Sequence, residues 1–327
     1  MISRRDTLKG AAAFSVATGV GGAFAADPYP SRPITIVVPY PPGGTVGAMA
    51  RLLAERVGTA IKGKFVVENK GGAAGSVGTL SVARAAPDGY TLVLGTQQTH
   101  ATNVFLVKNL QYDPVKDFVP IAQVSALQHL LVTRKDLGPK NLKEFVELAR
   151  SKADGLIYGS TGVGSAAHFI TELFRTQARI PTLVHVPFRG AAPLAQELLG
   201  GRVDFAMASV ASILGQVESG LVIALGTASD TRSPNFKDLP TFKEMGVDVG
   251  SADAWFTLFA PTGTPKEIVT LLETEIQRQL SKDDVKRTAI ELGLIPDFKA
   301  GSEVATALPA EIQRWAAIAK SANMIAE

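Results

Sequence analysis

The chain has no cysteine among its 327 residues. This absence excludes disulfide bonds, metal sites built on thiolates and a cysteine nucleophile. Histidine is also scarce, with four in the chain, and neither an H-E-x-x-H zinc helix nor a G-x-S-x-G nucleophile turn occurs. The sequence therefore predicts no bound metal, no cofactor and no catalytic set, so the fold must depend on its hydrophobic core.

An excess of either charge is lacking as well. Lys and Arg number 33 against 30 Asp and Glu. Near the amino terminus, Arg4, Arg5 and Lys9 supply three cations and Asp6 one acid, so that removing residues 1–25 leaves 30 cations against 29 acids, a net charge of +1. A balance of this kind provides no basic surface for nucleic acid.

No apolar run has the length and hydrophobicity to cross a bilayer, which takes about 20 strongly apolar residues. The best candidate is the Gly/Ala-rich stretch 11–25, which follows the charged SRRDTLKG and ends in AFA. This layout is typical of a secretory signal cleaved after Ala25, and the adjacent Arg4 and Arg5 indicate the twin-arginine type. We therefore expect residues 1–25 to be a signal peptide and the mature protein to work in the periplasm. An uncleaved membrane anchor is the alternative.

Two glycine-containing stretches match nucleotide-binding patterns incompletely. GTAIKGKF, residues 58–65, has the spacing of a phosphate-binding loop, but Phe65 stands where a Ser or Thr hydroxyl must reach magnesium. GSTGVGSAAH, residues 159–168, contains the glycines of a dinucleotide pattern, but no acid follows about 20 residues later. Neither stretch predicts a nucleotide site.

Short β-branched runs alternate with helix-period segments, which predicts an α/β fold with mostly parallel sheets flanked by helices. We expect strands at residues 34–38, 65–68, 91–95, 156–159, 182–186, 203–208 and 221–227. A helix with one apolar face is expected to begin at about Thr45. The segment TPKE predicts another helix start, with Thr264 as its cap and Glu267 closing a capping box.

The stretch FVPIAQVSALQHLLVTR, residues 118–134, is much longer than the usual strand of about 5 or 6 residues. A long strand shared between two lobes explains this length, and a second crossing is expected between residues 221 and 259. We therefore expect a first lobe of residues 26–125 and 246–327 and a second lobe of residues 126–245, with boundaries placed to within about 15 residues.

Four similar turns follow predicted strands and precede helix-period segments. They are YPPGGTVG at residues 40–47, GTQQTHATN at 95–103, GSTGVGSAAH at 159–168 and VPFRGAAP at 186–193. Their small residues expose backbone N–H groups at helix starts, where the helix dipole favours anions. In open α/β sheets such turns gather at the carboxyl ends of the strands. Any single turn can be plain loop closure, but four together predict a carboxylate site gripped from two lobes without a metal.

The segments that carry these turns resemble the Bug (Bordetella uptake gene) family, the periplasmic solute receptors of tripartite tricarboxylate transport systems. The matching segments are YPSRPITIVVPYPPGGTVGAMARLLAERV, VVENKGGAAGSVGTLSVARAAPDGYTLVLGT, YDPVKDFVPIAQV, VHVPFRGAAP, LLGGRVDFAM and AWFTLFAPTGTPKEIV. They cover essentially the whole mature chain in order. The resemblance implies a two-lobe periplasmic-binding-protein (type II) fold, joined by two crossing strands, that closes on a small carboxylate. We expect a monomer whose partners are the permease subunits of the transporter.

Carried over position by position, the resemblance implies the residues of the site. The first lobe is expected to contribute Tyr40, Pro42, Gly43, Gly44, Thr45 and Val46, with Thr96, Gln97 and His100 beside them. The second lobe is expected to contribute Ser160, Thr161, Gly164, Ser165, Ala166, His168, Phe188, Arg189, Gly190 and Asp204. The family commonly has an acid where this chain has Gly47. Its loss favours a dicarboxylic or neutral-bodied ligand over an amino acid, unless Gly47 merely loosens the turn.

Some of these residues have structural alternatives. Arg189 can pair with a ligand carboxylate through two hydrogen bonds or be an ordinary surface arginine. Asp204 can face the ligand or brace a strand. His129 and His185 are expected to be packing or hydrogen-bonding groups rather than ligand contacts, while Trp255 and Phe256 are expected in the core.

These features predict a non-catalytic extracytoplasmic receptor that closes on its ligand and presents the closed form to a membrane partner. Two alternatives stay open. One is a ligand-sensing subunit for a signalling partner. The other is an exported hydrolase, although its nucleophile, base and acid are not apparent.

Overall fold

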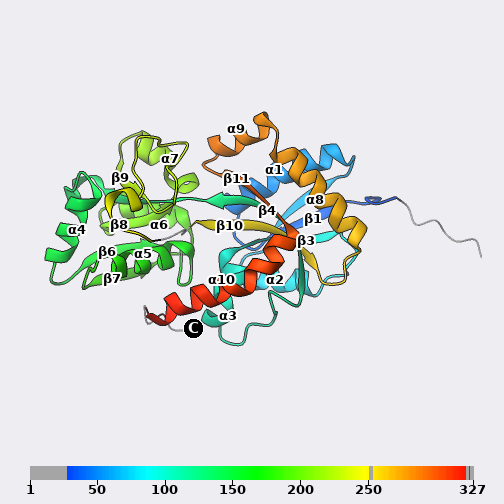
Figure 1. The fold of residues 1–327 in the computed structure, drawn as a ribbon, viewed down its shortest axis with the longest axis horizontal. Coiled ribbons are helices and arrows are strands. Elements are labelled where there is room, and N and C mark those ends of the chain that lie inside the picture. Colours follow the sequence, from blue (N-terminus) through cyan, green and yellow to red (C-terminus); the bar gives the residue numbers. More distant parts are fainter. Residues whose placement is uncertain (1–27, 250–252, 322–323, 325–327) are drawn as a thin grey trace, which may run out of the picture.

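The computed structural model describes residues 28–249, 253–321 and 324 of the chain. The predicted signal peptide, residues 1–25, lies outside the described residues. The described chain forms two α/β lobes, each built on one sheet (Figure 1). None of the described helices combines the length and the apolar character needed to cross a membrane.

The first lobe is built on a six-stranded sheet in the order β11-β4-β10-β3-β1-β2. Its strands are β1 (Ile34–Val38), β2 (Phe65–Asn69), β3 (Thr91–Thr96), β4 (Phe118–Leu127), β10 (Ala254–Pro261) and β11 (Ile295–Ala300). Strand β1 pairs in parallel with β2 and β3. Strand β10 is antiparallel to β3 and β4, and β11 is antiparallel to β4.

The helices of this lobe are α1 (Thr45–Ala60), α2 (Ser76–Ala83), α3 (Asn103–Leu106), α8 (Lys266–Leu280), α9 (Asp283–Glu291) and α10 (Gly301–Ser321). Alternate residues of the strands face two different cores, as the two-residue period of a strand requires. Ile36 and Leu94 pack in the same cluster as residues of α1, α8 and α9. Val37 and Val93 point the other way, into a cluster with residues of α2 and α10.

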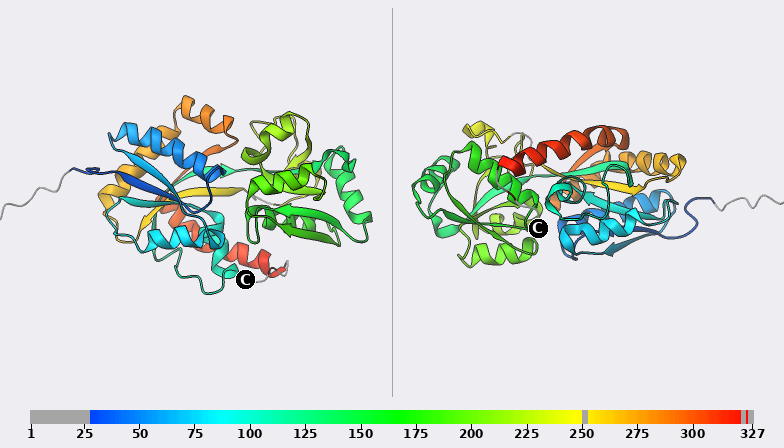
Figure 2. Two further views of the ribbon diagram at one scale, coloured as in Figure 1. Left: turned by 180° about the vertical axis from the view of Figure 1, so that it is seen from behind. Right: turned by 90° about the horizontal axis from the view of Figure 1, so that it is seen from below.

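The second lobe is built on a five-stranded sheet in the order β7-β6-β8-β5-β9. Its strands are β5 (His129–Arg134), β6 (Leu156–Ser160), β7 (Leu183–Pro187), β8 (Phe205–Ser209) and β9 (Val222–Thr227). One face carries α4 (Leu142–Ser151) and α5 (Ala166–Gln177), and the other carries α6 (Ala191–Leu199) and α7 (Val210–Glu218). Helix α10 extends from the first lobe onto the second (Figure 2). Its Trp315 contacts Phe169 of α5 edge-on, at 5.2 Å between ring centroids.

The chain first passes between the lobes at Gln128. The predicted long strand over residues 118–134 is in fact two strands, because β4 ends at Leu127 in one sheet and β5 begins at His129 in the other. The return path lies between Thr227 at the end of β9 and Ala254 at the start of β10. Each sheet is mixed, because the strand that enters it from the other lobe, β10 in the first sheet and β5 in the second, runs against the neighbouring strands of its parallel set.

The register of the strands places the crossings between the lobes at the carboxyl ends of the parallel strands in both sheets. In the first sheet, Phe256 lies opposite Thr96 and Ala254 opposite Leu127, so the crossing and the carboxyl ends of β1 and β3 share one edge. In the second sheet, His129 lies opposite Ser209, so the crossing lies at the carboxyl ends of β6 and β8. The turns that follow these strands therefore approach each other across the junction of the lobes.

Most of the predicted elements are confirmed. The seven predicted strands are present with ends shifted by no more than two residues, and α1 begins at Thr45 as expected. Trp255 and Phe256 are buried, as predicted. The predicted capping box is wrong: the N-cap residue of α8 is Pro265, without a side-chain cap. The Thr264 hydroxyl instead donates to the Pro261 carbonyl at 2.8 Å and closes the preceding turn.

Candidate ligand-binding site

The first-lobe turn, residues 39–45, leads from β1 into α1 with its backbone exposed. Pro42, Gly43 and Gly44 are exposed, whereas Thr45 is half-buried and Val46 is buried in the core below. Gly43 has φ 92°, a left-handed conformation that favours glycine. Gly44 is the N-cap of α1 and provides no side-chain cap. The amides of the first turn of α1 are thus available to an anion.

Side chains beneath this turn form a small hydroxyl and amide cluster. The Tyr40 hydroxyl lies 2.8 Å from Thr96 Oγ1 and donates to Gln98 Oε1 at 3.1 Å. Burial raises the pKa of Tyr40, so its hydroxyl stays protonated and remains a donor at neutral pH. Asn69 Nδ2 donates to the Tyr40 carbonyl at 2.9 Å and fixes the start of the turn.

Two predicted first-lobe residues lie deeper than the turn. His100 is fully buried and stacks on Phe259 at 3.9 Å between ring centroids. Burial lowers its pKa to about 3, so the imidazole is neutral, and Nδ1 lies 2.9 Å from Thr99 Oγ1. Gln97 is only 1% exposed. Both residues therefore lie below the surface of the loop after β3, and Gln97 Nε2 makes no hydrogen bond to any residue that the structure describes.

The second-lobe turn, residues 160–166, leads from β6 into α5 and is bound by its own side chains. Gly162 and Gly164 have φ 136° and 76°. Ser165 is the N-cap of α5 and accepts a hydrogen bond from the His168 amide at 3.4 Å. His168 Nδ1 in turn accepts from the Gly164 amide at 3.2 Å. Of the predicted residues here, Thr161 and Ala166 remain half-buried, while Ser160, Ser165 and His168 are buried.

The turn after β7 contributes a free positive charge. Phe188 donates its amide to the Ser160 carbonyl at 3.0 Å, which ties this turn to the preceding one. Arg189 is exposed and makes no ion pair with any described residue. Gly190, with φ 108°, is the N-cap of α6 and gives that helix no side-chain cap. A guanidinium beside an uncapped helix start suits a carboxylate.

Asp204 lies away from these turns. It precedes β8, and its two carboxylate oxygens accept from Arg134 Nε at 3.0 Å and from the Ile157 amide at 2.8 Å. Because β6 and β8 are parallel, this is the opposite end of the sheet from Ser160. The geometry fits the alternative in which Asp204 braces the strands, since both of its oxygens are already occupied.

Gln98 and Thr102 join the two lobes, and the sequence reasoning did not single them out. Gln98 Nε2 donates to the Val163 carbonyl at 3.3 Å, and Thr102 Oγ1 donates to the Gly164 carbonyl at 3.0 Å. Both come from the π-helical turn Gln98–Thr102 that follows β3. The sequence feature that could have identified this pair is their spacing of four residues, because it places two polar side chains on one side of a helical turn.

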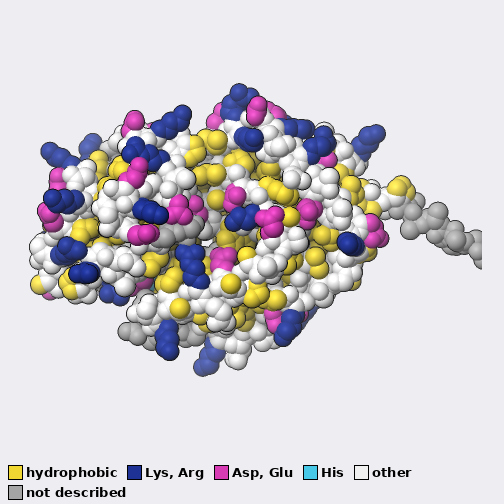
Figure 3. Space-filling view, in the orientation of Figure 1, with side chains coloured by type: hydrophobic (Ala, Val, Ile, Leu, Met, Phe, Trp, Pro, Cys, Tyr) yellow, Lys and Arg dark blue, Asp and Glu magenta, His cyan; other side chains and the backbone are white. Residues whose placement is uncertain are grey.

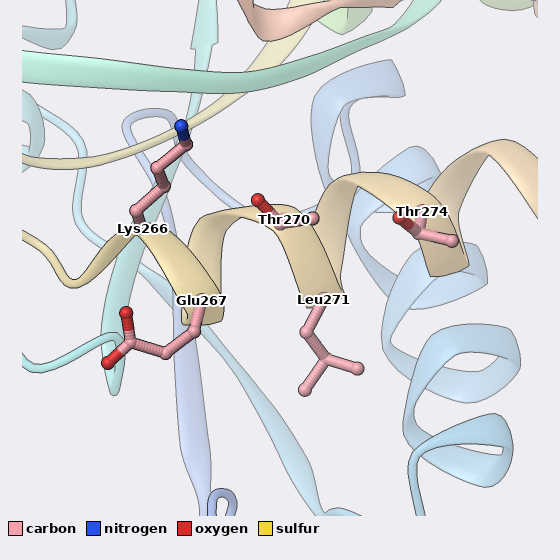
Figure 4. Close-up of a pocket in the computed structure, with 5 residues that line it drawn as sticks. All are labelled: Lys266, Glu267, Thr270, Leu271 and Thr274. Carbon is pink, nitrogen blue, oxygen red and sulfur yellow. The ribbon is translucent and has the colours of Figure 1, made fainter.

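Two surface depressions lie apart from these turns. One, of about 610 Å³, is lined by Lys266, Glu267, Thr270, Leu271 and Thr274. All five come from α8 and their side chains diverge, so they do not converge on a ligand (Figure 4). The other, of about 380 Å³, lies beside α3 and is lined mainly by residues 104–115. Cations and acids are interspersed over the face drawn in Figure 3, which shows no basic patch.

Comparison with known proteins gives a consistent result over most of the chain. Residues 49–324 match the family described as "Tripartite tricarboxylate transporter family receptor". Protein BugT of Bordetella pertussis is 33% identical over 310 residues, which cover 94% of each chain.

Solved structures agree in fold. An R. palustris protein with adipate superposes with a TM-score of 0.86 at 34% identity, covering 91% of this chain and 100% of that one. MatC from Rhodopseudomonas palustris with bound malate gives 0.79 at 34% identity, covering 89% and 99% of the two chains.

Proposed function

Because this chain belongs to the tripartite tricarboxylate transporter receptor family, we propose that it is an extracytoplasmic receptor that binds a small carboxylate between its lobes. The lobe built on the six-stranded sheet and the lobe built on the five-stranded sheet close toward each other on the ligand. Closure of the lobes buries the ligand, and the closed monomer delivers it to membrane permease subunits. The predicted signal peptide, residues 1–25, directs the chain to the periplasm.

One observation carries the proposal. The starts of α1 and α6 lack side-chain caps. Both follow the carboxyl ends of parallel strands, at the ends of the two sheets that face the lobe junction. Arg189 adds a guanidinium without an ion partner among the described residues. Uncapped amides, helix dipoles and a free guanidinium together favour a carboxylate and need no metal. In the described residues no group of three or more His, Cys, Asp or Glu is placed to hold a metal ion.

We propose a dicarboxylate as the ligand. Adipate and malate, the compounds bound in two similar structures, are dicarboxylates. Gly47 leaves the first lobe without the acid that an amino-acid ligand would use. A Cβ added at Gly47 would lie 3.3 Å from Arg51 Nη1, so an acid there would have a cation within reach.

We propose no enzymatic role. Ser165 already caps α5. Ser160 lies 2.7 Å from His185 Nε2, in the manner of a nucleophile and base, but it is fully buried and therefore cannot attack a substrate. Ester turnover that disappears in the Ser160→Ala and Ser165→Ala variants would contradict this part of the proposal.

A thermal-shift screen of the mature protein against mono-, di- and tricarboxylates and amino acids tests the proposal. A ligand at 100 times its Kd should stabilise the fold by about 2.7 kcal/mol. Mass spectrometry of small molecules released on denaturation should identify any carboxylate retained through purification. If no carboxylate stabilises the protein and none is released, carboxylate binding is excluded.

A further inference from the structure

Three aromatic rings from three elements pack against one another beneath the second-lobe turn. Tyr158 of β6 and His185 of β7 stack at 4.7 Å between ring centroids, and His185 and His168 of α5 stack at 3.9 Å, each pair with planes 18° apart. Tyr158 and His168 are also in contact, at 6.3 Å between centroids. The Tyr158 hydroxyl donates to Glu172 at 2.7 Å, and Glu172 is paired with Arg175. The turn thus lies over a cluster of three packed rings, and the acid that contacts this cluster already has two partners.

Each imidazole holds a different part of the turn. His168 Nδ1 accepts from the Gly164 amide at 3.2 Å, so its proton must lie on Nε2. His185 Nε2 lies 2.7 Å from Ser160 Oγ. Ser160 Oγ in turn contacts the Gly162 amide at 3.2 Å and donates to the Gly162 carbonyl at 3.0 Å.

These contacts favour a proton on Nε2 of His185. A serine hydroxyl has one hydrogen to donate and two lone pairs that accept. When the hydrogen of Ser160 goes to the Gly162 carbonyl, one lone pair takes the Gly162 amide and the other accepts from His185 Nε2. Donation from Ser160 to His185 would instead leave the Gly162 carbonyl without this hydrogen bond. The first arrangement uses every hydrogen-bonding position of the Ser160 hydroxyl.

We propose that His185 is a positioning residue for the ligand site: by donating to Ser160 and stacking on His168, it holds the second-lobe turn in its binding conformation. This inference rests on the proposed carboxylate site. His185 acts through Ser160 and Gly162. Its ring packs against both Tyr158 and His168, and Ser160 has no exposed surface. In this proposal the Nε2–H of a neutral His185 imidazole donates to Ser160. Burial favours the neutral form, because it lowers the pKa of both His168 and His185.

The proton positions can be measured directly in the wild-type protein. Long-range ¹H–¹⁵N NMR of the imidazoles at pH 7.5 should show the Nε2–H tautomer for both His168 and His185. A His185 imidazole with its proton on Nδ1 would overturn the inference. This measurement needs no ligand and no variant, so it stands even if no carboxylate binds.

Variants then test the consequence for the turn. His185→Phe keeps a ring for stacking but removes the donor, whereas His185→Gln keeps an N–H donor. We expect the Gly162 and Gly164 amides to exchange about fivefold faster in His185→Phe, as suits the loss of one hydrogen bond, and to recover in His185→Gln. Val184→Ala, an exposed neighbour on β7, should leave both rates unchanged. Unchanged exchange in His185→Phe would contradict the proposal.

Adipate affinity, measured by calorimetry, separates positioning from general stability. His185→Phe and Ser160→Ala should each weaken binding about fivefold, and the double variant should be no weaker than either, because both remove the same hydrogen bond. Losses that multiply would contradict the inference. If wild-type protein binds no carboxylate, the proposed function fails, whereas the tautomer and exchange results still decide the role of His185.

Discussion

The first-lobe and second-lobe turns have the same layout, a parallel strand that leads into a helix start, but they are held by different means. The first-lobe turn depends on prolines, on Gly43 at φ 92° and on the hydroxyls of Tyr40 and Thr96. The second-lobe turn rests on His168, which is buried, and on His185, which is half-buried, and burial lowers the pKa of both. The first-lobe turn should therefore respond to replacement of its glycines, because their backbone conformation holds it. The second-lobe turn should respond to protonation of the imidazoles that hold it.

Acidification should therefore weaken the second lobe more than the first. Burial lowers the pKa of His129 to about 4 and that of His168 to about 3, from an ordinary 6.5, and lowers that of His185 as well. The unfolded chain then binds protons first as the pH falls, so the stability that these groups provide is complete above about pH 6.5 and declines below it. At pH 4.5, the loss from His129 and from His168 should each lower the free energy of unfolding by about 3 kcal/mol.

Hydrogen exchange resolved by lobe at pH 7.5 and 4.5 measures this difference. The first lobe contains one such group, His100, so protection should decrease more in β5–β8 than in β1–β3. Asp253 acts in the opposite direction, because burial raises its pKa to about 6, but it lies next to the crossing between the lobes. Equal loss of protection in both sheets would remove the distinction between the lobes.

Arg189→Gln should remove the positive charge by which the second-lobe turns differ from the first-lobe turns. The first-lobe turns, residues 40–47 and 95–103, contain no Lys or Arg. Removing the exposed Arg189 should weaken dicarboxylate binding by about 10- to 100-fold, the range for a charged hydrogen-bonded pair, and change stability by less than about 0.5 kcal/mol. Arg84→Gln, an exposed arginine at the end of α2, is the matched control for calorimetry. Equal affinities in both variants would mean that Arg189 is an ordinary surface residue.

Replacing the adjacent glycines of the first-lobe turn should give different results. Gly43 has φ 92°, so Gly43→Ala should cost about 1 kcal/mol and weaken ligand binding. Gly44 has φ −86° and no atom within 4 Å of an added Cβ, so Gly44→Ala should cost a few tenths of a kcal/mol. Chemical denaturation and calorimetry on both variants test whether the backbone conformation of Gly43 holds the turn. Identical behaviour would show that it does not.

Gln98→Leu should weaken the link between the first-lobe and second-lobe turns, and we expect it to have a smaller effect on ligand affinity than Arg189→Gln. It removes the acceptor of the Tyr40 hydroxyl and the donor to the Val163 carbonyl. Tyr40 keeps its contact with Thr96, so we expect about a threefold loss of affinity. Gln111→Leu, which removes an exposed amide bonded to the Asn109 carbonyl, serves as control. A loss above about 30-fold would indicate that Gln98 contacts the ligand itself.

Much of the fold follows from local patterns. The β-branched runs locate seven strands, and the change to a helical period locates the start of α1. The length of the stretch 118–134 indicates a crossing, but its break at Gln128 is decided by tertiary contacts. Gln128 Nε2 donates to Ser229 Oγ at 2.9 Å and to the Thr231 carbonyl at 3.1 Å. These partners lie about 100 residues away, beyond the reach of local sequence patterns.

The sequence by itself determines where the turns lie, because glycine and proline restrict the backbone locally and helix starts expose amides wherever they occur. Tertiary structure alone decides which neighbouring side chains serve them. It buries His100 under Phe259, directs Asp204 to Arg134 and Ile157, and places His185 against Ser160. These partners are 25 to 159 residues apart in the chain, and only the pairing of strands within the two sheets brings them into contact.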